Sequence, residues 1–252
     1  MDIATLEALL PYVGIGFAAQ LVDGALGMAF GVICNTLLVG VLGLPPALAS
    51  AKVHVVECFT TASSGLSHLF HRNIDKRLFL KLLVPGVAGG VAGAYLLTSI
   101  DASAIKPFVL GYLALIGAYI FVRGLLWPPK PREARTVAPL GLLGGFLDAA
   151  GGGGWGPVVT ANLLVQGVEP RRVIGTVSAV EFFLTIAVSA TFIAHMGLVD
   201  LLGATLGLIV GGIVAAPIGA WAARHIPLKP MLIFVGSVLT ATSLFGIWKA
   251  LG

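Results

Sequence analysis

The sequence predicts an all-α protein that crosses a membrane many times, built from two repeats of about five apolar segments each that run in opposite directions. Of its 252 residues, 58% are hydrophobic and only 10% are charged, and the mean hydropathy is +1.01. A soluble domain carries about 25% charged residues, so this chain cannot cover a water-facing surface. Helices are expected throughout, because open strands cannot satisfy their backbone hydrogen bonds in lipid.

Turn signals and charges divide the chain into apolar segments, several of which approach or reach the roughly 20 residues that span a hydrocarbon core. The ten segments lie near residues 6–22, 28–43, 47–71, 77–99, 103–126, 138–149, 155–168, 171–195, 198–223 and 229–250. Those at 138–149 and 155–168 are short for a core about 30 Å thick, and they predict a re-entrant hairpin. Residues 6–22 and 28–43 predict its counterpart from the opposite face.

A proline-rich stretch at 128–135 is the one clear linker in the sequence. It predicts a first membrane repeat at 1–127, a cytoplasmic linker at 128–137 and a second repeat at 138–252. Because five is an odd number of segments, the second repeat must run in the opposite sense. Most of the 15 lysines and arginines lie in or beside alternate loops, which places those loops in the cytoplasm and both termini outside it.

A glycine-rich break occurs at the same place in each half, at 21–31 and at 146–156. The matched pairs are Asp23 and Asp148, Gly27 and Gly152, and Gly31 and Gly156, each 125 positions apart. Apolar helices interrupted at corresponding points of two halves indicate the binding site of a transporter.

The glycine turns would expose backbone amides and the positive ends of the helices that follow, an arrangement that suits an anion. The alternative is that the glycines allow tight helix packing in lipid. The tryptophan that follows the four consecutive glycines is expected to wall the cavity. The residues expected to contribute from the turns are Gly27, Gly31, Gly152, Gly153, Gly154 and Trp155.

The most polar helix face lies in the segment at 47–71. A lysine at Lys52 needs a ligand or a partner in lipid, and either an anion or an ion pair with Glu57 or Asp23 would supply it. His54 could relay a proton or serve as a hydrogen-bonded core histidine. The side chains expected to bind the anion, with their counterparts in the second half, are Lys52, His54, Thr176 and Ser178.

Four carboxylates within the apolar segments are candidates for proton coupling. Glu57 lies about 18 Å along a helix from Pro45, near the middle of the membrane, and Glu181 reaches a similar depth from the other face. An ionisable group at that depth is a functional hypothesis by default. Asp23 and Asp148 precede the two breaks, where capping of the loop is the alternative role.

The motifs Gly151-Gly-Gly-Gly-Trp-Gly-Pro157 and Val173-Ile-Gly-Thr-Val-Ser178 resemble those of the sulfite exporter TauE/SafE family of membrane permeases. The paired breaks, the hydrophilic linker and the duplication extend the resemblance over nearly the whole chain. It implies a bacterial inner-membrane permease that moves sulfite or small organosulfur anions such as sulfoacetate. The first half departs from the pattern, with fewer glycines and with Lys52 and His54 replacing small polar residues, so countercharge is expected there.

We therefore expect a secondary transporter of a small sulfur oxyanion that works by alternating access, with a proton as the candidate coupling ion. The alternatives are an anion channel, an intramembrane enzyme and a non-transporting membrane partner. Neither a Gly-x-Ser-x-Gly nor a His-Glu-x-x-His motif occurs, so an enzyme is not expected. No cofactor and no metal are expected either. The expected partners are the small anion and the lipid bilayer, without nucleic acid, and a homodimer is left open.

Overall fold

The structure is a computed structural model that describes residues 3–26, 28–70, 72–126, 136–160, 162–163, 166, 168, 170–197, 202–222 and 228–251. Within these residues the chain is helical and holds no strand, which confirms the predicted all-α class. The first half contains α1 (Ile3–Leu26), α2 (Phe30–Asn35), the π-helix η1 (Thr36–Val41), α3 (Pro46–Phe70), α4 (Lys76–Ser99) and α5 (Ala102–Leu125). The second half contains α6 (Val137–Gly151), the π-helix η2 (Trp155–Thr160), α8 (Pro170–Met196), α9 (Leu202–Ala222) and α10 (Leu228–Leu251).

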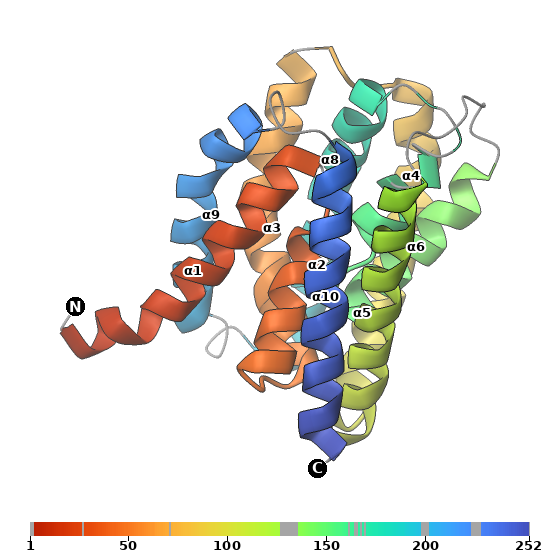
Figure 1. Cartoon of the computed structure of the whole chain (residues 1–252). Coiled ribbons are helices and arrows are strands. Elements are labelled where there is room, and N and C mark those ends of the chain that lie inside the picture. The colour runs from red at the N-terminus through yellow and green to blue at the C-terminus, as the bar shows by residue number, and fades with distance from the viewer. Residues whose placement is uncertain are drawn as a thin grey trace.

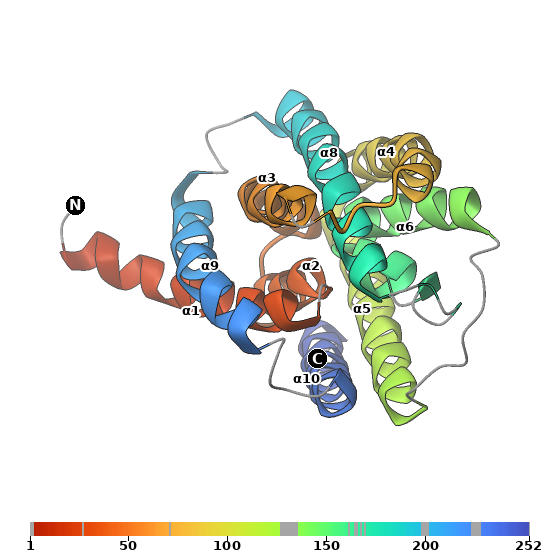
Figure 2. The same cartoon turned by 90° about the horizontal axis from the view of Figure 1, so that it is seen from above.

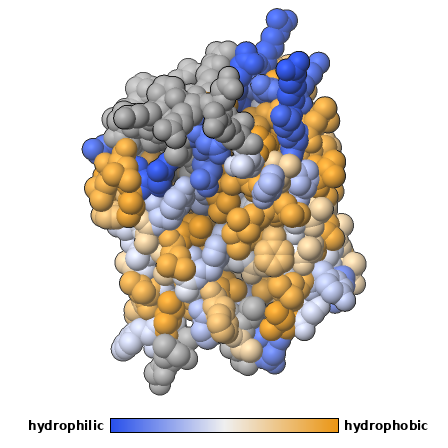
Figure 3. Space-filling model, turned by 90° about the vertical axis from the view of Figure 1, so that its right-hand side faces the viewer, coloured by the Kyte–Doolittle hydropathy of each residue, from blue (hydrophilic) through white to orange (hydrophobic). Residues whose placement is uncertain are grey.

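The outer surface of the helices is apolar. In the described part of the chain, three helical stretches are long and apolar enough to cross a membrane: Lys76–Ser99, Pro107–Leu125 and Arg172–Met196. Large side chains such as Phe108 and Leu115 are 75% and 72% exposed on this surface. In Figure 3, hydrophobic residues cover the middle of the face and hydrophilic residues gather toward its upper end. Such a surface fits lipid, as expected of a multi-pass membrane protein.

Two pairs of helices flank a central pair. Helices α3 and α8 pack together at the centre, α1 packs against α9 on one side, and α4 packs against α6 on the other (Figure 1, Figure 2). Helices α5 and α10 also pack against each other. The sequence repeat matches α1 with α6 and α4 with α9. The pair α1–α9 is therefore the repeat counterpart of the pair α6–α4. Two related halves would produce this pairing, while their opposite orientation stays a prediction.

Glycines set the close approach within both flanking pairs. A methyl group placed at Gly89 of α4 would lie 2.9 Å from the backbone nitrogen of Phe146 in α6. One placed at Gly211 of α9 would lie 2.7 Å from the backbone nitrogen of Phe17 in α1. Small residues therefore bring these helix backbones together, as they do in lipid.

The helices around the second break are short. Helix α6 has 15 residues, about 22 Å, and η2 has six, so neither crosses a core about 30 Å thick. Helix α1 has 24 residues and is long enough to cross it alone. Residues 128–135 of the predicted linker lie outside the described residues, and the boundaries of the repeats stay predictions.

Candidate functional site

The second glycine break is a tight turn organised by Asp148. Helix α6 ends at Gly151, and Gly152 and Gly153 follow with φ of 78° and 136°, values that glycine adopts without the strain of a Cβ atom. The Oδ1 atom of Asp148 accepts hydrogen bonds from the backbone nitrogens of Gly154 at 2.8 Å and Trp155 at 2.9 Å. The predicted capping role of this aspartate is therefore present.

The first break has a simpler version of the same turn. The Oδ1 atom of Asp23 accepts one hydrogen bond, from the backbone nitrogen of Phe30 at 3.3 Å. Phe30 and Trp155 are matched by the repeat, so each aspartate holds the amide seven residues further on. The residue before α2 is Ala29, which adopts a φ of 104° without being glycine. Gly27, a predicted binding residue, lies outside the described residues.

The two breaks lie directly against each other. A methyl group placed at Gly153 would lie 2.8 Å from the backbone carbon of Gly31, and one placed at Gly156 would lie 2.6 Å from the Cβ atom of Met28. We call this contact, between residues 28–35 and residues 148–157, the repeat junction. Side chains larger than glycine would force the two breaks apart.

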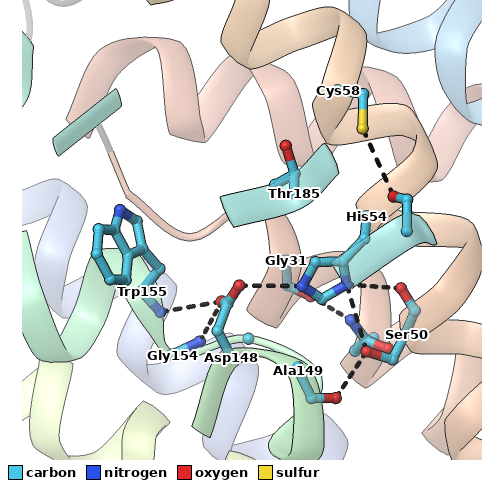
Figure 4. A network of polar contacts seen from close by, with 12 residues as sticks. Gly31, Ser50, His54, Cys58, Asp148, Ala149, Gly154, Trp155 and Thr185 are labelled. Atoms are coloured by element: carbon cyan, nitrogen blue, oxygen red, sulfur yellow. Dashed lines mark hydrogen bonds and ion pairs between the residues drawn. The ribbon is translucent and has the colours of Figure 1, made fainter. Parts of the chain in front are cut away.

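His54 of α3 connects the junction to the central helices. Its Nε2 atom lies 3.0 Å from Asp148 Oδ2, and its Nδ1 atom lies 2.7 Å from the backbone oxygen of Ser50. The hydroxyl group of Ser50 donates to the backbone oxygen of Ala149 at 2.9 Å. Two polar links, His54 to Asp148 and Ser50 to Ala149, therefore hold α3 to the end of α6 (Figure 4).

Glu57 lies almost one turn further along α3, beside the same links. It is 3% exposed, and its carboxylate, the His54 ring and the Asp148 carboxylate offer atoms that all lie within 4.8 Å of one another. It also lies close enough to Asp23, Asp148 and Glu181 for their charges to interact. The structure thus gathers the four predicted carboxylates around the junction. The expectation that no metal binds stays a prediction.

The remaining predicted polar side chains are arranged differently. The hydroxyl oxygen of Thr176 accepts a hydrogen bond from the backbone nitrogen of Asp75 at 2.8 Å, so in this conformation it holds the loop between α3 and α4. Ser178, which lies with Thr176 in α8, is buried. Lys52 is also buried and interacts with another group. Because residues two apart do not share a helix face, Lys52 points to a different side of α3 from His54.

Trp155 is completely buried rather than facing an open cavity. Its Nε1 atom donates to the backbone oxygen of Val177 at 3.2 Å, which ties the second break to α8. The amides of Gly154 and Trp155 donate to Asp148, so an anion would reach them only by displacing that carboxylate. The predicted amide cradle is therefore closed in this conformation.

Three polar side chains at or near the junction were not among the predicted residues. The Tyr112 hydroxyl donates to the backbone oxygen of Gly153 at 2.9 Å, and the Asn35 amide donates to that of Gly31 at 3.1 Å. Within the described part of the chain, Asn35 Oδ1 and Thr160 Oγ1 are buried without a hydrogen-bond partner. Asn35 and Thr160 are separated by the 125-residue offset of the repeat. Two polar residues at matched positions of apolar segments were therefore the feature of the sequence that could have identified them.

Comparisons with known proteins agree with this architecture. A family model described as sulfite exporter TauE/SafE matches residues 12–245. The chain is 38% identical over 257 residues to the probable membrane transporter protein YtnM of Bacillus subtilis (strain 168), an alignment that covers 97% of this chain and 85% of that relative. No solved structure matches it. These matches confirm the resemblance carried by the glycine motifs, and the chain belongs to the sulfite exporter TauE/SafE family of membrane transporters.

Proposed function

We propose that the protein is a secondary transporter that carries a small sulfur-containing oxyanion, such as sulfite or sulfoacetate, across the inner membrane by alternating access. The repeat junction is the observation that carries this proposal. There, two chain segments broken at matched positions pack together among buried ionisable groups, the arrangement typical of a transporter's binding site. The family match supports a sulfur oxyanion as the substrate class.

The closure of the junction favours a carrier over an anion channel. Residues 151–157 are all buried, and hydrogen bonds from α3 hold the end of α6 in place. A substrate can reach this contact only if the two halves rearrange, and rearrangement around a fixed site is the basis of alternating access. The alternatives are a channel, which would conduct without saturation, and an intramembrane enzyme, which would form product in micelles without two compartments.

The charges at the junction support coupling of the anion to a proton. Four carboxylates surround the junction, and in their ionised forms they repel a second anion in a medium of low dielectric constant. Protonation removes part of this repulsion, so anion binding and proton binding favour each other by linkage. We therefore propose that the anion and a proton move in the same direction.

Uptake into proteoliposomes tests this function. We expect saturable transport of sulfite or sulfoacetate, faster with an inward proton gradient, and weaker transport of sulfate and acetate. Lys52→Met keeps most of the side-chain volume and removes the charge, and we expect it to reduce uptake, while Lys81→Met, at an exposed position of α4, serves as the control. Uptake by Lys52→Met equal to that of the parent for every anion would exclude Lys52 from the anion site.

We also propose that the loop before α4 faces the cytoplasm and that both termini lie outside it. The exposed Arg77, at the start of α4, is a suitable reporter position. A cysteine introduced by Arg77→Cys should react with a membrane-impermeant maleimide only after the cells are permeabilised. Labelling of intact cells would reverse the orientation.

A further inference from the structure

We propose that His54 and Asp148 together bind the proton that is coupled to transport, and that this proton holds α3 of the first half to the end of α6 in the second half. The inference rests on the proposed transport function and deepens it, because it identifies the coupling ion and its site. It places the proton on a histidine–aspartate pair that bridges the two halves, rather than on either membrane glutamate alone.

The hydrogen-bond geometry requires a proton at this pair. A backbone carbonyl oxygen only accepts hydrogen bonds, so Nδ1 of His54, 2.7 Å from the Ser50 oxygen, carries a hydrogen. Nε2 lies 3.0 Å from Asp148 Oδ2, and a second hydrogen must lie between these atoms, on the ring or on the carboxyl group. The pair therefore holds one proton more than a neutral imidazole facing a carboxylate.

Loss of that proton breaks one of the two links between α3 and α6. If the remaining hydrogen stays on Nδ1, the lone pair of Nε2 faces the Asp148 carboxylate and the two groups repel. If it moves to Nε2, Nδ1 faces the Ser50 carbonyl oxygen and needs a donor. The Ser50 hydroxyl, 3.4 Å from Nδ1, is the nearest one, but it already donates to Ala149. Each deprotonated arrangement thus gives up either the His54–Asp148 link or the Ser50–Ala149 link.

The surroundings favour a positive charge at the pair. In the described part of the chain, the ionisable groups that face the pair or the adjacent Glu57 are Asp23 of α1, Cys34 of α2, Glu57 and Cys58 of α3, Tyr112 of α5 and Glu181 of α8. None of these groups is cationic, and Lys52 points to another side of α3. The Tyr112 hydroxyl already donates to Gly153. The repeat matches Ser178 of the second half with His54 of the first, so Asp23 has no histidine at the corresponding position. We therefore expect a single shared proton, at the His54–Asp148 pair.

Asp148→Asn is the decisive variant because it preserves the hydrogen bonds and removes the carboxylate that is proposed to share the proton. The amide oxygen can accept from Gly154 and Trp155 as the carboxylate does. The amide nitrogen can donate to Nε2 of a neutral His54, whose Nδ1 still donates to Ser50. Asp75→Asn is the matched control, since Asp75 also accepts two backbone hydrogen bonds, from Arg77 at 2.9 Å and Leu78 at 3.1 Å, away from the junction.

Two transport measurements with sulfite in proteoliposomes separate coupling from binding. Net uptake driven by a proton gradient requires the empty carrier to release its proton, whereas exchange between equal sulfite concentrations does not. We expect Asp148→Asn to lose net uptake and keep exchange, and Asp75→Asn to keep both. Retained gradient-driven uptake in folded Asp148→Asn overturns the proposal, and so does loss of net uptake and exchange together. Glu57→Gln provides the comparison, and the proposal is wrong if that variant alone uncouples transport.

A measurement without substrate separates this proposal from the transport function. The extra proton is bound in the folded protein, where the pair is joined, so its stabilising effect is present at low pH and is lost as pH rises. The midpoint of thermal unfolding in micelles should therefore fall with rising pH more steeply in the parent than in Asp148→Asn. If this difference appears but no anion is transported, the transport function fails and the proton site stands. Identical pH profiles would overturn the proton site, and His54→Gln replaces Asp148→Asn if the latter does not fold.

Discussion

The two glycine breaks have the same plan but differ in what holds them. Asp148 in the second break accepts two backbone hydrogen bonds at 2.8 and 2.9 Å and contacts His54. Asp23 in the first break accepts one, at 3.3 Å, within the described part of the chain. The second turn uses consecutive glycines for its positive φ angles, whereas the first places Ala29 in that region. The second break is therefore the more firmly organised of the two.

This difference shows how the same residue of a duplicated unit can have an additional contact in one of the two copies. The aspartate was suited to holding a turn in both halves, because a carboxylate placed before exposed amides caps them. Within the described part of the chain, only the second aspartate contacts a histidine from the other half, and we propose that this pair shares a proton. The repeat gives both halves the same turn, but His54 and the matched Ser178 differ, so we expect the two aspartates to differ in proton binding.

Removing each aspartate in turn should give the largest difference between the halves. Asp148→Ala leaves His54 and two amides without their partner, and we expect it to lower the free energy of unfolding by about 4 kcal/mol. Asp23→Ala loses one long hydrogen bond, and we expect about 1 kcal/mol. Unfolding by sodium dodecyl sulfate in mixed micelles measures both. Equal losses would mean that the two turns are held equally.

Closing the space between the breaks should have the next largest effect. Gly153→Ala combines a φ of 136° with a methyl group 2.8 Å from the backbone of Gly31, and we expect it to cost about 2–4 kcal/mol. Gly14→Ala, in α1 with no atom within 4 Å of the added methyl group, is the control and should cause no loss. A fully stable Gly153→Ala protein would show that the two breaks do not touch.

Much of the fold follows from patterns that the sequence repeats. Apolar runs and turn residues predicted the helical segments, and the offset between Asp23 and Asp148 predicted that the two breaks correspond. The similar depths of Glu57 and Glu181 were also predicted, but the meeting of all four carboxylates at one place was not. The predicted features depend on the spacing of residues along the chain, and that spacing can be read directly from the sequence.

The partners of individual side chains could not be predicted in this way. His54 was expected beside the anion with Lys52, but the helix turns Lys52 to another side and points His54 at Asp148. Trp155 was expected to wall a cavity, yet its nitrogen donates to Val177 in α8. Such contacts depend on the rotation of each helix against neighbours far away in sequence. A single sequence does not contain that information.

Relaxing the strained residue of the first break should have a smaller effect of opposite sign. Ala29 has a φ of 104°, so Ala29→Gly should raise the free energy of unfolding by about 1–2 kcal/mol. Ala18→Gly, at an exposed position within α1, is the matched control and should lower it by about 1 kcal/mol. The same unfolding titration compares them. Two equal losses would mean that Ala29 is not strained and that the first break is as relaxed as the second.

The smallest expected effect distinguishes the repeat-matched polar residues Asn35 and Thr160. Thr160 is buried, with no hydrogen-bond partner for its hydroxyl in the described part of the chain, so Thr160→Val should raise the free energy of unfolding by up to about 1 kcal/mol. Asn35→Leu loses the bond to Gly31 and should lower it. If Thr160→Val is destabilising instead, its hydroxyl must bind water or another group in the folded protein. The second break would then contain a polar site of its own, separate from the His54–Asp148 pair.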